Sequence, residues 1–80
     1  MTQARVQLVG KRDCHLCDDA RATIAAVCEE TGNGWTEVFI DDDPMLADEY
    51  ADQVPVVLVD GRMHDFFRVD QMRLRAALAP

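Results

Sequence analysis

The chain has 80 residues, 49% of them hydrophobic and 29% charged, which is typical of one small globular domain spanning residues 1–80. Eight Lys and Arg against fifteen Asp and Glu give a net charge of -7, which argues against nucleic-acid binding because that function needs a basic face. The longest apolar run, Val54–Val59, is too short to cross a bilayer, and Met1–Gly10 lacks the apolar core of a secretion signal. We therefore expect a cytoplasmic protein that does not bind membranes.

The first half of the chain predicts two strands separated by a long helix. Arg5–Val9 alternates polar and apolar residues and ends at Gly10, which is typical of a strand. From Leu16 to Thr31 apolar residues recur at helical spacing, and the turn Gly32–Gly34 ends the helix. Thr36–Ile40 is rich in β-forming residues and predicts the second strand.

The second half begins with a short helix and continues with a pair of strands. Asp43 can cap a helix that Pro44 opens and that ends near residue 50 or 51. Val56–Val59 is apolar on both faces, which favours a central strand. The pair Asp60-Gly61 is a strong hairpin signal, so Met63–Phe67 should form an antiparallel fourth strand.

The last predicted element is a capped helix. Asp70 occupies the cap position, and Val69 and Leu74 are spaced as a hydrophobic staple around it. The resulting order is β-α-β-α-β-β-α. Parallel strands joined by a helical crossover and followed by a hairpin predict an α/β fold, with a mixed four-stranded sheet flanked by helices.

Cys14 and Cys17 form a C-x-x-C motif just after the first strand, where the first helix begins. A helix N-terminus carries partial positive charge and favours a thiolate there. Residues three apart in a first helical turn lie on one side, so the two sulfur atoms can meet in disulfide geometry. We expect Cys14 to be the nucleophile and Cys17 the resolving thiol in disulfide exchange that needs no bound cofactor.

Other uses of the motif remain open. A C-x-x-C pair can supply half of a zinc site, but a second pair is missing, because His15 lies between the thiols and His64 is far along the chain. The alternative function is a redox-inactive or metal-carrying binding module with the same fold. Cys28 lies on the apolar stripe of the first helix and is expected to be buried, whereas His64, on an edge strand, is expected to be solvated.

The chain resembles the glutaredoxin family, and especially short bacterial glutaredoxin-like proteins with a C-x-L-C centre. The resemblance rests on Lys11–Cys17, with its basic residue three before the nucleophile, on Val54–Val56, and on the hairpin and helix that follow, up to Leu78. It implies a thioredoxin-like fold and a thiol-disulfide oxidoreductase that reduces protein or low-molecular-weight mixed disulfides. Thioredoxin-like proteins of this size are usually monomeric, so the resemblance also implies a monomer.

The resemblance also implies a set of substrate-binding residues. Glutaredoxins use glutathione as electron donor, so Lys11 would hold its glycyl carboxylate and the backbone of Val54 would pair with its cysteinyl unit. Pro55 would be cis and lie beside the disulfide, where substrates can add a strand. Five further residues are candidates for contacting substrate or tuning the thiolate: Arg12, His15, Leu16, Arg68 and Asp70.

Phe67-Arg68 stands where glutaredoxins carry the Gly-Gly that lets glutathione approach the backbone. The electron donor therefore stays open between glutathione, another low-molecular-weight thiol and a flavoprotein reductase. The expected partners are disulfide-containing proteins. Asp70 has two interpretations, as the acidic residue that the family carries at this helix start and as a helix cap.

Overall fold

The computed structural model describes residues 4–79. The elements are β1 (Val6–Gly10), α1 (His15–Thr31), β2 (Trp35–Phe39), the 3-10 helix η1 (Ile40–Asp42), α2 (Pro44–Tyr50), β3 (Val56–Val59), β4 (Arg62–Phe66) and α3 (Gln71–Leu78). Apart from η1, this is the predicted order, and the boundaries differ from the predicted ones by at most one residue. No helix within residues 4–79 is long and apolar enough to cross a bilayer.

The four strands form one mixed sheet in the order β2-β1-β3-β4. β1 pairs in parallel with β2 and antiparallel with β3, and β3 pairs antiparallel with β4. The parallel pair requires a crossover, which α1 supplies. The predicted central position of the wholly apolar strand β3 is confirmed, since β1 and β4 flank it.

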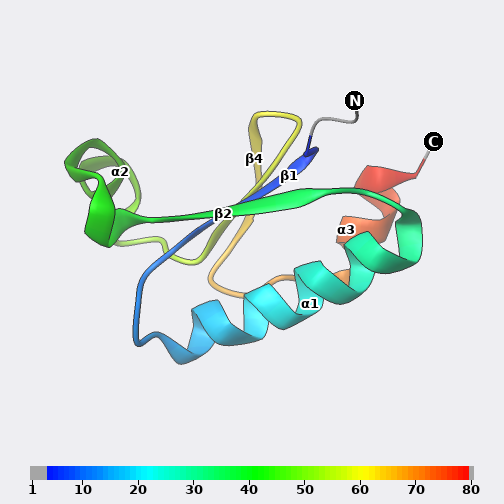
Figure 1. Ribbon diagram of the computed structural model, residues 1–80, viewed down its shortest axis with the longest axis horizontal. Helices are drawn as coiled ribbons and strands as arrows, with labels where there is room; N and C mark the ends of the chain where they lie inside the picture. Colours follow the sequence, from blue (N-terminus) through cyan, green and yellow to red (C-terminus); the bar gives the residue numbers. More distant parts are fainter. Residues whose placement is uncertain (1–3, 80) are drawn as a thin grey trace.

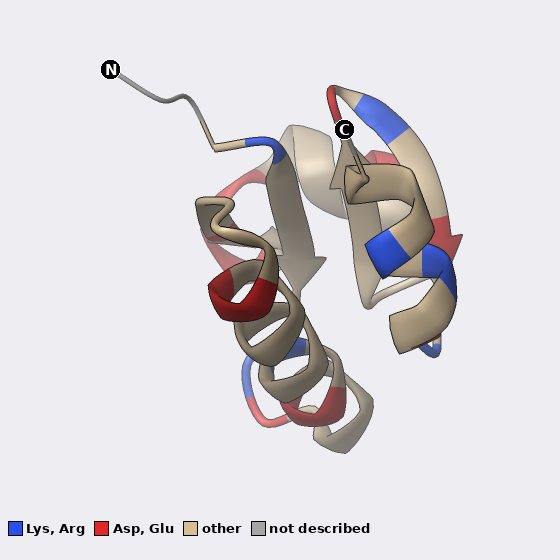
Figure 2. Cartoon of the chain, turned by 90° about the vertical axis from the view of Figure 1, so that its right-hand side faces the viewer, with Lys and Arg blue, Asp and Glu red and all other residues tan. Residues whose placement is uncertain are grey.

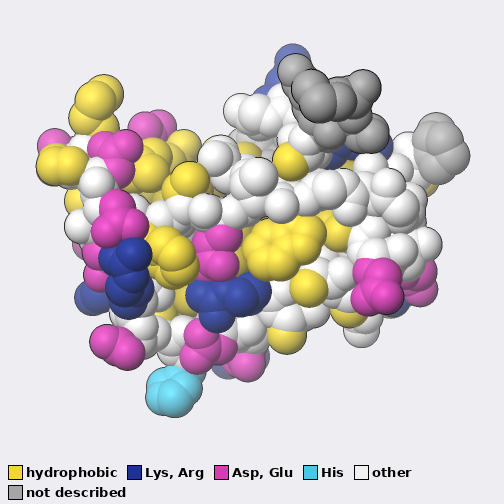
Figure 3. Space-filling model, viewed as in Figure 1, with side chains coloured by type: hydrophobic (Ala, Val, Ile, Leu, Met, Phe, Trp, Pro, Cys, Tyr) yellow, Lys and Arg dark blue, Asp and Glu magenta, His cyan; other side chains and the backbone are white. Residues whose placement is uncertain are grey.

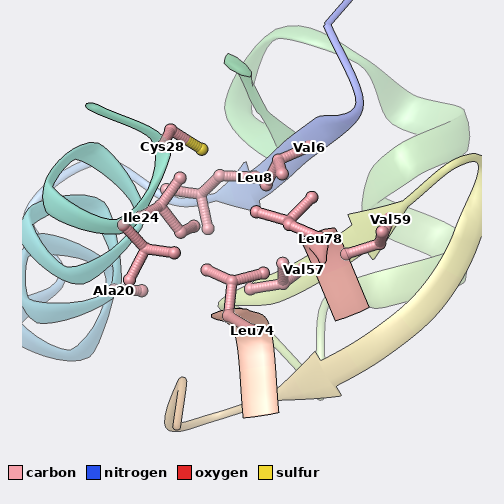
Figure 4. Packing of buried hydrophobic residues seen from close by; sticks show 10 residues of the cluster. Val6, Leu8, Ala20, Ile24, Cys28, Val57, Val59, Leu74 and Leu78 are labelled. Carbon is pink, nitrogen blue, oxygen red and sulfur yellow. The ribbon is translucent and has the colours of Figure 1, made fainter. Parts of the chain in front are cut away.

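Helices cover both faces of the sheet, as predicted, and together with the sheet they make a thioredoxin-like α/β fold (Figure 1). α1 and α3 lie side by side on one face, where their apolar side chains pack on β1 and β3 (Figure 4). The buried residues of this cluster are Val6, Leu8, Ala20, Ile24, Val27, Cys28, Val57, Val59, Leu74 and Leu78. The predicted burial of Cys28 is thereby confirmed.

The other face of the sheet carries a smaller cluster. It is centred on Val9, Ile40 and Val56, and α2 contributes Leu46 and Tyr50 to it. The two clusters therefore place α1 on one side of β1 and α2 on the other, and both begin near the same end of the sheet (Figure 1).

The predicted helix caps are present. The Asp43 carboxylate accepts the amide of Met45 at 2.9 Å, with Pro44 in the first turn of α2. Asp70 accepts the amide of Met72 at 2.8 Å at the start of α3. Both carboxylates satisfy amide groups that would otherwise have no partner within the helix.

The hairpin between β3 and β4 confirms one prediction and corrects another. Asp60 and Gly61 both have positive φ, at 53° and 83°, as the tight turn requires. β4 then contains a register shift opposite the bond between Val57 and Leu58. His64 is half-buried, and its Nε2 atom is buried without a partner among the described residues, so the prediction of a solvated His64 is wrong. The cause is the irregular register, because a bulge redirects side chains relative to a regular strand.

Charge is distributed unevenly over the helices. Figure 2 shows acidic residues on α1 and basic residues on α3. Glu30 on α1 and Arg75 on α3 form an ion pair across the two helices. The pair lies far from the cysteine motif, at the opposite end of α1.

Candidate active site

Cys14 is the N-cap residue of α1. Its backbone is extended, with φ -124° and ψ 115°, and its Sγ atom accepts the backbone N–H of Cys17 at 3.3 Å. The carbonyl of Cys14 accepts the amide of Asp18 at 3.0 Å, which closes the first helical turn. The sulfur thus occupies the place of an ordinary capping oxygen, at the positive end of the helix dipole.

The two cysteines of the motif differ in access to solvent. Cys14 is partly exposed, whereas Cys17 is 0% exposed. The backbone amide of Lys11 donates a hydrogen bond of 3.4 Å to the sulfur of Cys17. A substrate disulfide can therefore reach Cys14 first, with Cys17 directly behind it.

The surroundings of Cys17 favour the neutral thiol. Burial raises the pKa of the Cys17 thiol to about 11, and the hydrogen bond to Cys14 acts in the same direction. The amide of Lys11 and the positive charge of Arg21 oppose this rise. At neutral pH Cys17 therefore carries its proton, and it has to lose that proton before it can attack a disulfide.

Three residues that the sequence analysis did not select also lie at this site. Arg21 on α1 donates two hydrogen bonds to Glu37 on β2, at 2.7 and 2.6 Å, and a third to Asp18 at 2.8 Å. Gly10 ends β1, and a Cβ atom placed there would lie 3.4 Å from Glu37 Oε2 and 3.6 Å from Cys17 Sγ. Arg21 follows Cys17 by four residues, a spacing that places both on one side of α1 and could have indicated the contact.

A cleft of about 230 Å³ opens beside the motif. Leu16 of the motif lines it on one side, and Phe67 and Arg68 line it from the loop that follows β4. The structure therefore brings together two of the predicted substrate-binding residues, Leu16 and Arg68. Phe67 has a positive φ of 63°, in the left-handed region that favours glycine, so β4 ends one residue earlier than predicted.

The Val54-Pro55 peptide bond is cis, as the resemblance implies. The side chain of Pro55 is fully buried, and its carbonyl accepts the amide of Phe67 at 2.8 Å. Main-chain pairing with a substrate strand at this position would therefore fall to Val54, which is half-buried.

Arg12 lies in an ion pair on the surface. Its guanidinium makes two hydrogen bonds of 2.8 Å to Asp42 and lies 4.6 Å from the centre of the Phe39 ring. The hydrogen bond to Arg12 holds the pKa of Asp42 below its ordinary value. The structure therefore pairs the Arg12 charge with Asp42, and a contact of Arg12 with substrate stays a prediction. The pair forms because η1 brings its carboxylates next to the loop before the motif.

The remaining predicted site residues are exposed. Lys11 precedes the motif and His15 lies within it, both with exposed side chains, whereas Asp70 uses its carboxylate to cap α3. Within residues 4–79 no three His, Cys, Asp or Glu side chains are grouped so that they could hold a metal ion. The face of the molecule drawn in Figure 3 carries acidic, basic and hydrophobic side chains next to one another.

Comparisons with known sequences identify relatives over nearly the whole chain. A family model described as Glutaredoxin-like domain (DUF836) matches residues 5–79. Protein Rv0508 of Mycobacterium tuberculosis is 33% identical over 84 residues, which covers 99% of this chain and 87% of that protein.

Solved structures support the same assignment. The structural genomics target protein XcR50 of X. campestris is 38% identical, with a TM-score of 0.76, and the match covers 94% of this chain and 99% of that one. A thioredoxin from Halobacterium salinarum has a TM-score of 0.63 at 21% identity, over 94% of this chain and 73% of its own, and shows the fold alone. With its C-x-x-C motif at the start of α1, the chain belongs to the glutaredoxin-like domain family and has the thioredoxin fold.

Proposed function

We propose that this chain is a thiol-disulfide oxidoreductase of the glutaredoxin type, with Cys14 as nucleophile and Cys17 as resolving thiol. The observation that carries the proposal is the position of the Cys14 sulfur as cap of α1, with the buried Cys17 hydrogen-bonded behind it. A helix N-terminus stabilises a thiolate, and a partly exposed thiolate is the species that attacks disulfides.

The reaction consists of two exchanges. The Cys14 thiolate attacks one sulfur of a substrate disulfide, a bond forms to that sulfur, and the other substrate sulfur leaves as a thiolate that takes a proton from water. Cys17 then loses its proton and attacks the Cys14 sulfur. The mixed disulfide breaks, the second substrate thiolate leaves, and Cys14 and Cys17 remain joined by a disulfide, so two electrons have passed to the substrate.

Substrates of this reaction are disulfide-containing proteins or mixed disulfides with a low-molecular-weight thiol. The cleft lined by Leu16, Asp19 and Arg68 supplies an apolar wall and one charge of each sign beside the C-x-x-C motif. Glutathione, another low-molecular-weight thiol or a flavoprotein reductase returns the disulfide to the dithiol. Lys11 and Val54 are the residues that we propose to contact glutathione.

Counting free thiols through a glutathione redox titration tests the proposal. We expect three free thiols in the reduced protein and one in the oxidised protein, because Cys28 is buried and stays free. Three thiols under all conditions would overturn the proposal. Stoichiometric zinc or iron in the purified protein, together with an unchanged thiol count, would instead support a metal-carrying module.

Two serine variants assign the roles of the cysteines. Cys14→Ser should abolish reduction of a model disulfide, whereas Cys17→Ser should accumulate a mixed disulfide on Cys14 that is visible by mass spectrometry. Cys28→Ser is the matched control and should retain activity. Equal loss of activity in all three variants would contradict the assignment.

A further inference from the structure

In the proposed reaction, Cys17 has to lose its proton before it can attack the mixed disulfide. Its sulfur is 0% exposed, and burial raises its pKa to about 11. At neutral pH roughly one molecule in ten thousand would carry the thiolate, since each pH unit below the pKa reduces ionisation about tenfold. The resolving step therefore needs a nearby group that accepts the proton, because bulk water does not reach the sulfur.

The charged and titratable groups around the Cys17 sulfur come from two elements. α1 contributes Cys14 and Arg21, β2 contributes Glu37, and Lys11 contributes only its backbone amide. Of these groups, the Glu37 carboxylate can accept a proton without being a reactant itself.

The side chains of Glu37 and Cys17 both approach Gly10, where no side chain separates them. A Cβ atom at Gly10 would touch Glu37 Oε2 at 3.4 Å and Cys17 Sγ at 3.6 Å, so the two groups line the same small space. The side chain of Glu37 is only 15% exposed, which shields this space from solvent. Two hydrogen bonds from Arg21 fix the direction of the carboxylate.

We propose that Glu37, positioned by Arg21, accepts the proton of Cys17 when Cys17 attacks the mixed disulfide. The inference rests on the proposed function and names a further residue of the same site. The proton moves from Cys17 Sγ to the Glu37 carboxylate, directly or through one water molecule, and then to solvent. The bond between Cys14 and the substrate sulfur breaks, the bond between Cys14 and Cys17 forms, and the substrate leaves as a thiolate.

Arg21 interacts with both groups of this transfer, with Glu37 through hydrogen bonds and with Cys17 through its charge. Before the transfer its positive charge is balanced by Glu37 and Asp18, and after the transfer the Cys17 thiolate takes the place of Glu37. The net charge of these groups is therefore unchanged, and no isolated charge is created away from water. The positive charge of Arg21 already favours the thiolate of Cys17, which agrees with this role.

A chromophoric aromatic disulfide measures the two exchanges separately. With dithiobis(nitrobenzoate), the first release of the coloured thiolate reports the attack by Cys14 and the second reports the attack by Cys17. In Glu37→Gln we expect the second phase to slow by about a hundredfold or more at pH 7, while the first phase is unchanged. The slow phase should then accelerate about tenfold per pH unit toward pH 11, because only pre-ionised Cys17 reacts.

Glu30→Gln is the matched control, because it neutralises the carboxylate of the other Arg–Glu ion pair of α1, with Arg75. Both phases should be unchanged in this variant. A second variant, Gly10→Ala, alters no ionisable group and fits at ordinary contact distances, but its methyl group fills the space that Glu37 and Cys17 share. It should also slow the second phase alone.

The outcomes separate the two proposals. A wild-type protein that releases no coloured thiolate lacks the proposed function altogether. A normal second phase with a normal pH profile in both Glu37→Gln and Gly10→Ala overturns the role of Glu37 but leaves the oxidoreductase intact. If Glu37→Gln fails to fold, Gly10→Ala decides the question by itself.

Discussion

The backbone amide of Lys11 and the sulfur of Cys17 are joined by a hydrogen bond of 3.4 Å. This bond closes the turn between β1 and α1, because it ties the first residue after the strand to the first turn of the helix. It also favours the thiolate of Cys17, but burial acts more strongly in the other direction. Because the effect of burial is larger than that of the hydrogen bond, the folded protein has a raised Cys17 pKa. The stability of the protein should therefore depend on pH in the alkaline range.

The free energy of unfolding should fall in alkaline solution because the pKa of Cys17 differs between the folded and the unfolded protein. Folding raises the pKa of this thiol from 9.0 to about 11, so the unfolded chain releases the proton first. The stabilising contribution is therefore complete below pH 9 and is lost as the pH rises from 9 to 11. Across this window the free energy of unfolding should fall on the order of 2–3 kcal/mol more in the wild type than in Cys17→Ser.

Urea unfolding under reducing conditions at pH 8, 9, 10 and 11 measures this difference. Cys28, whose pKa is also raised by burial, is present in both proteins and cancels in the comparison. Parallel pH profiles of the wild type and Cys17→Ser would show that the fold does not perturb Cys17.

Two substitutions of Asp70 distinguish its role as a helix cap from a role as a substrate ligand. Asn caps helices about as well as Asp, so Asp70→Asn should keep the stability of the wild type, whereas Asp70→Ala should lose about 1 kcal/mol. The structure shows the capping role, since the carboxylate accepts the amides of Met72 and Arg73. We expect Asp70→Asn to reduce a mixed disulfide at the wild-type rate. A marked rise in KM in a stable Asp70→Asn protein would instead reveal a contact between the charge and the substrate.

Phe67 should limit the use of glutathione. It adopts φ 63°, which costs a non-glycine residue about 1–2 kcal/mol, and its ring lines the cleft next to Leu16. Phe67→Gly removes both the strain and the obstruction of the cleft by the ring. The KM for glutathione should therefore fall in Phe67→Gly, in a steady-state assay with a low-molecular-weight mixed disulfide.

The control for this experiment is Phe66→Ala. The rings of Phe66 and Phe67 are 4.9 Å apart and similarly exposed, but Phe66 lies in β4 with ordinary backbone geometry. Its removal should leave the KM for glutathione unchanged. If the two variants behave alike, loss of aromatic surface is the cause rather than access to the backbone.

Local signals in the sequence were enough to predict the elements, their order and the pair of cysteines at the start of α1. The caps Asp43 and Asp70, the turn Asp60-Gly61 and the helical spacing after Leu16 are local signals, and each acts through hydrogen bonds or dihedral angles within a few residues. The cysteine motif belongs to the same category, because a spacing of three in a first helical turn brings two residues together in any context.

Contacts between elements far apart in the sequence set which residues surround Cys17 and which charges are paired, and local patterns could not predict them. Glu37 lies twenty residues from Cys17, and both side chains approach Gly10 because β1 and β2 pair in one particular parallel register. Arg12 meets Asp42 for a related reason, since η1 follows β2 directly and lies next to the loop after β1. The bulge that draws His64 inward depends on the pairing of β3 with β4. The periodicity of the sequence shows which face of a strand is apolar. The register between two strands depends instead on how the whole sheet packs.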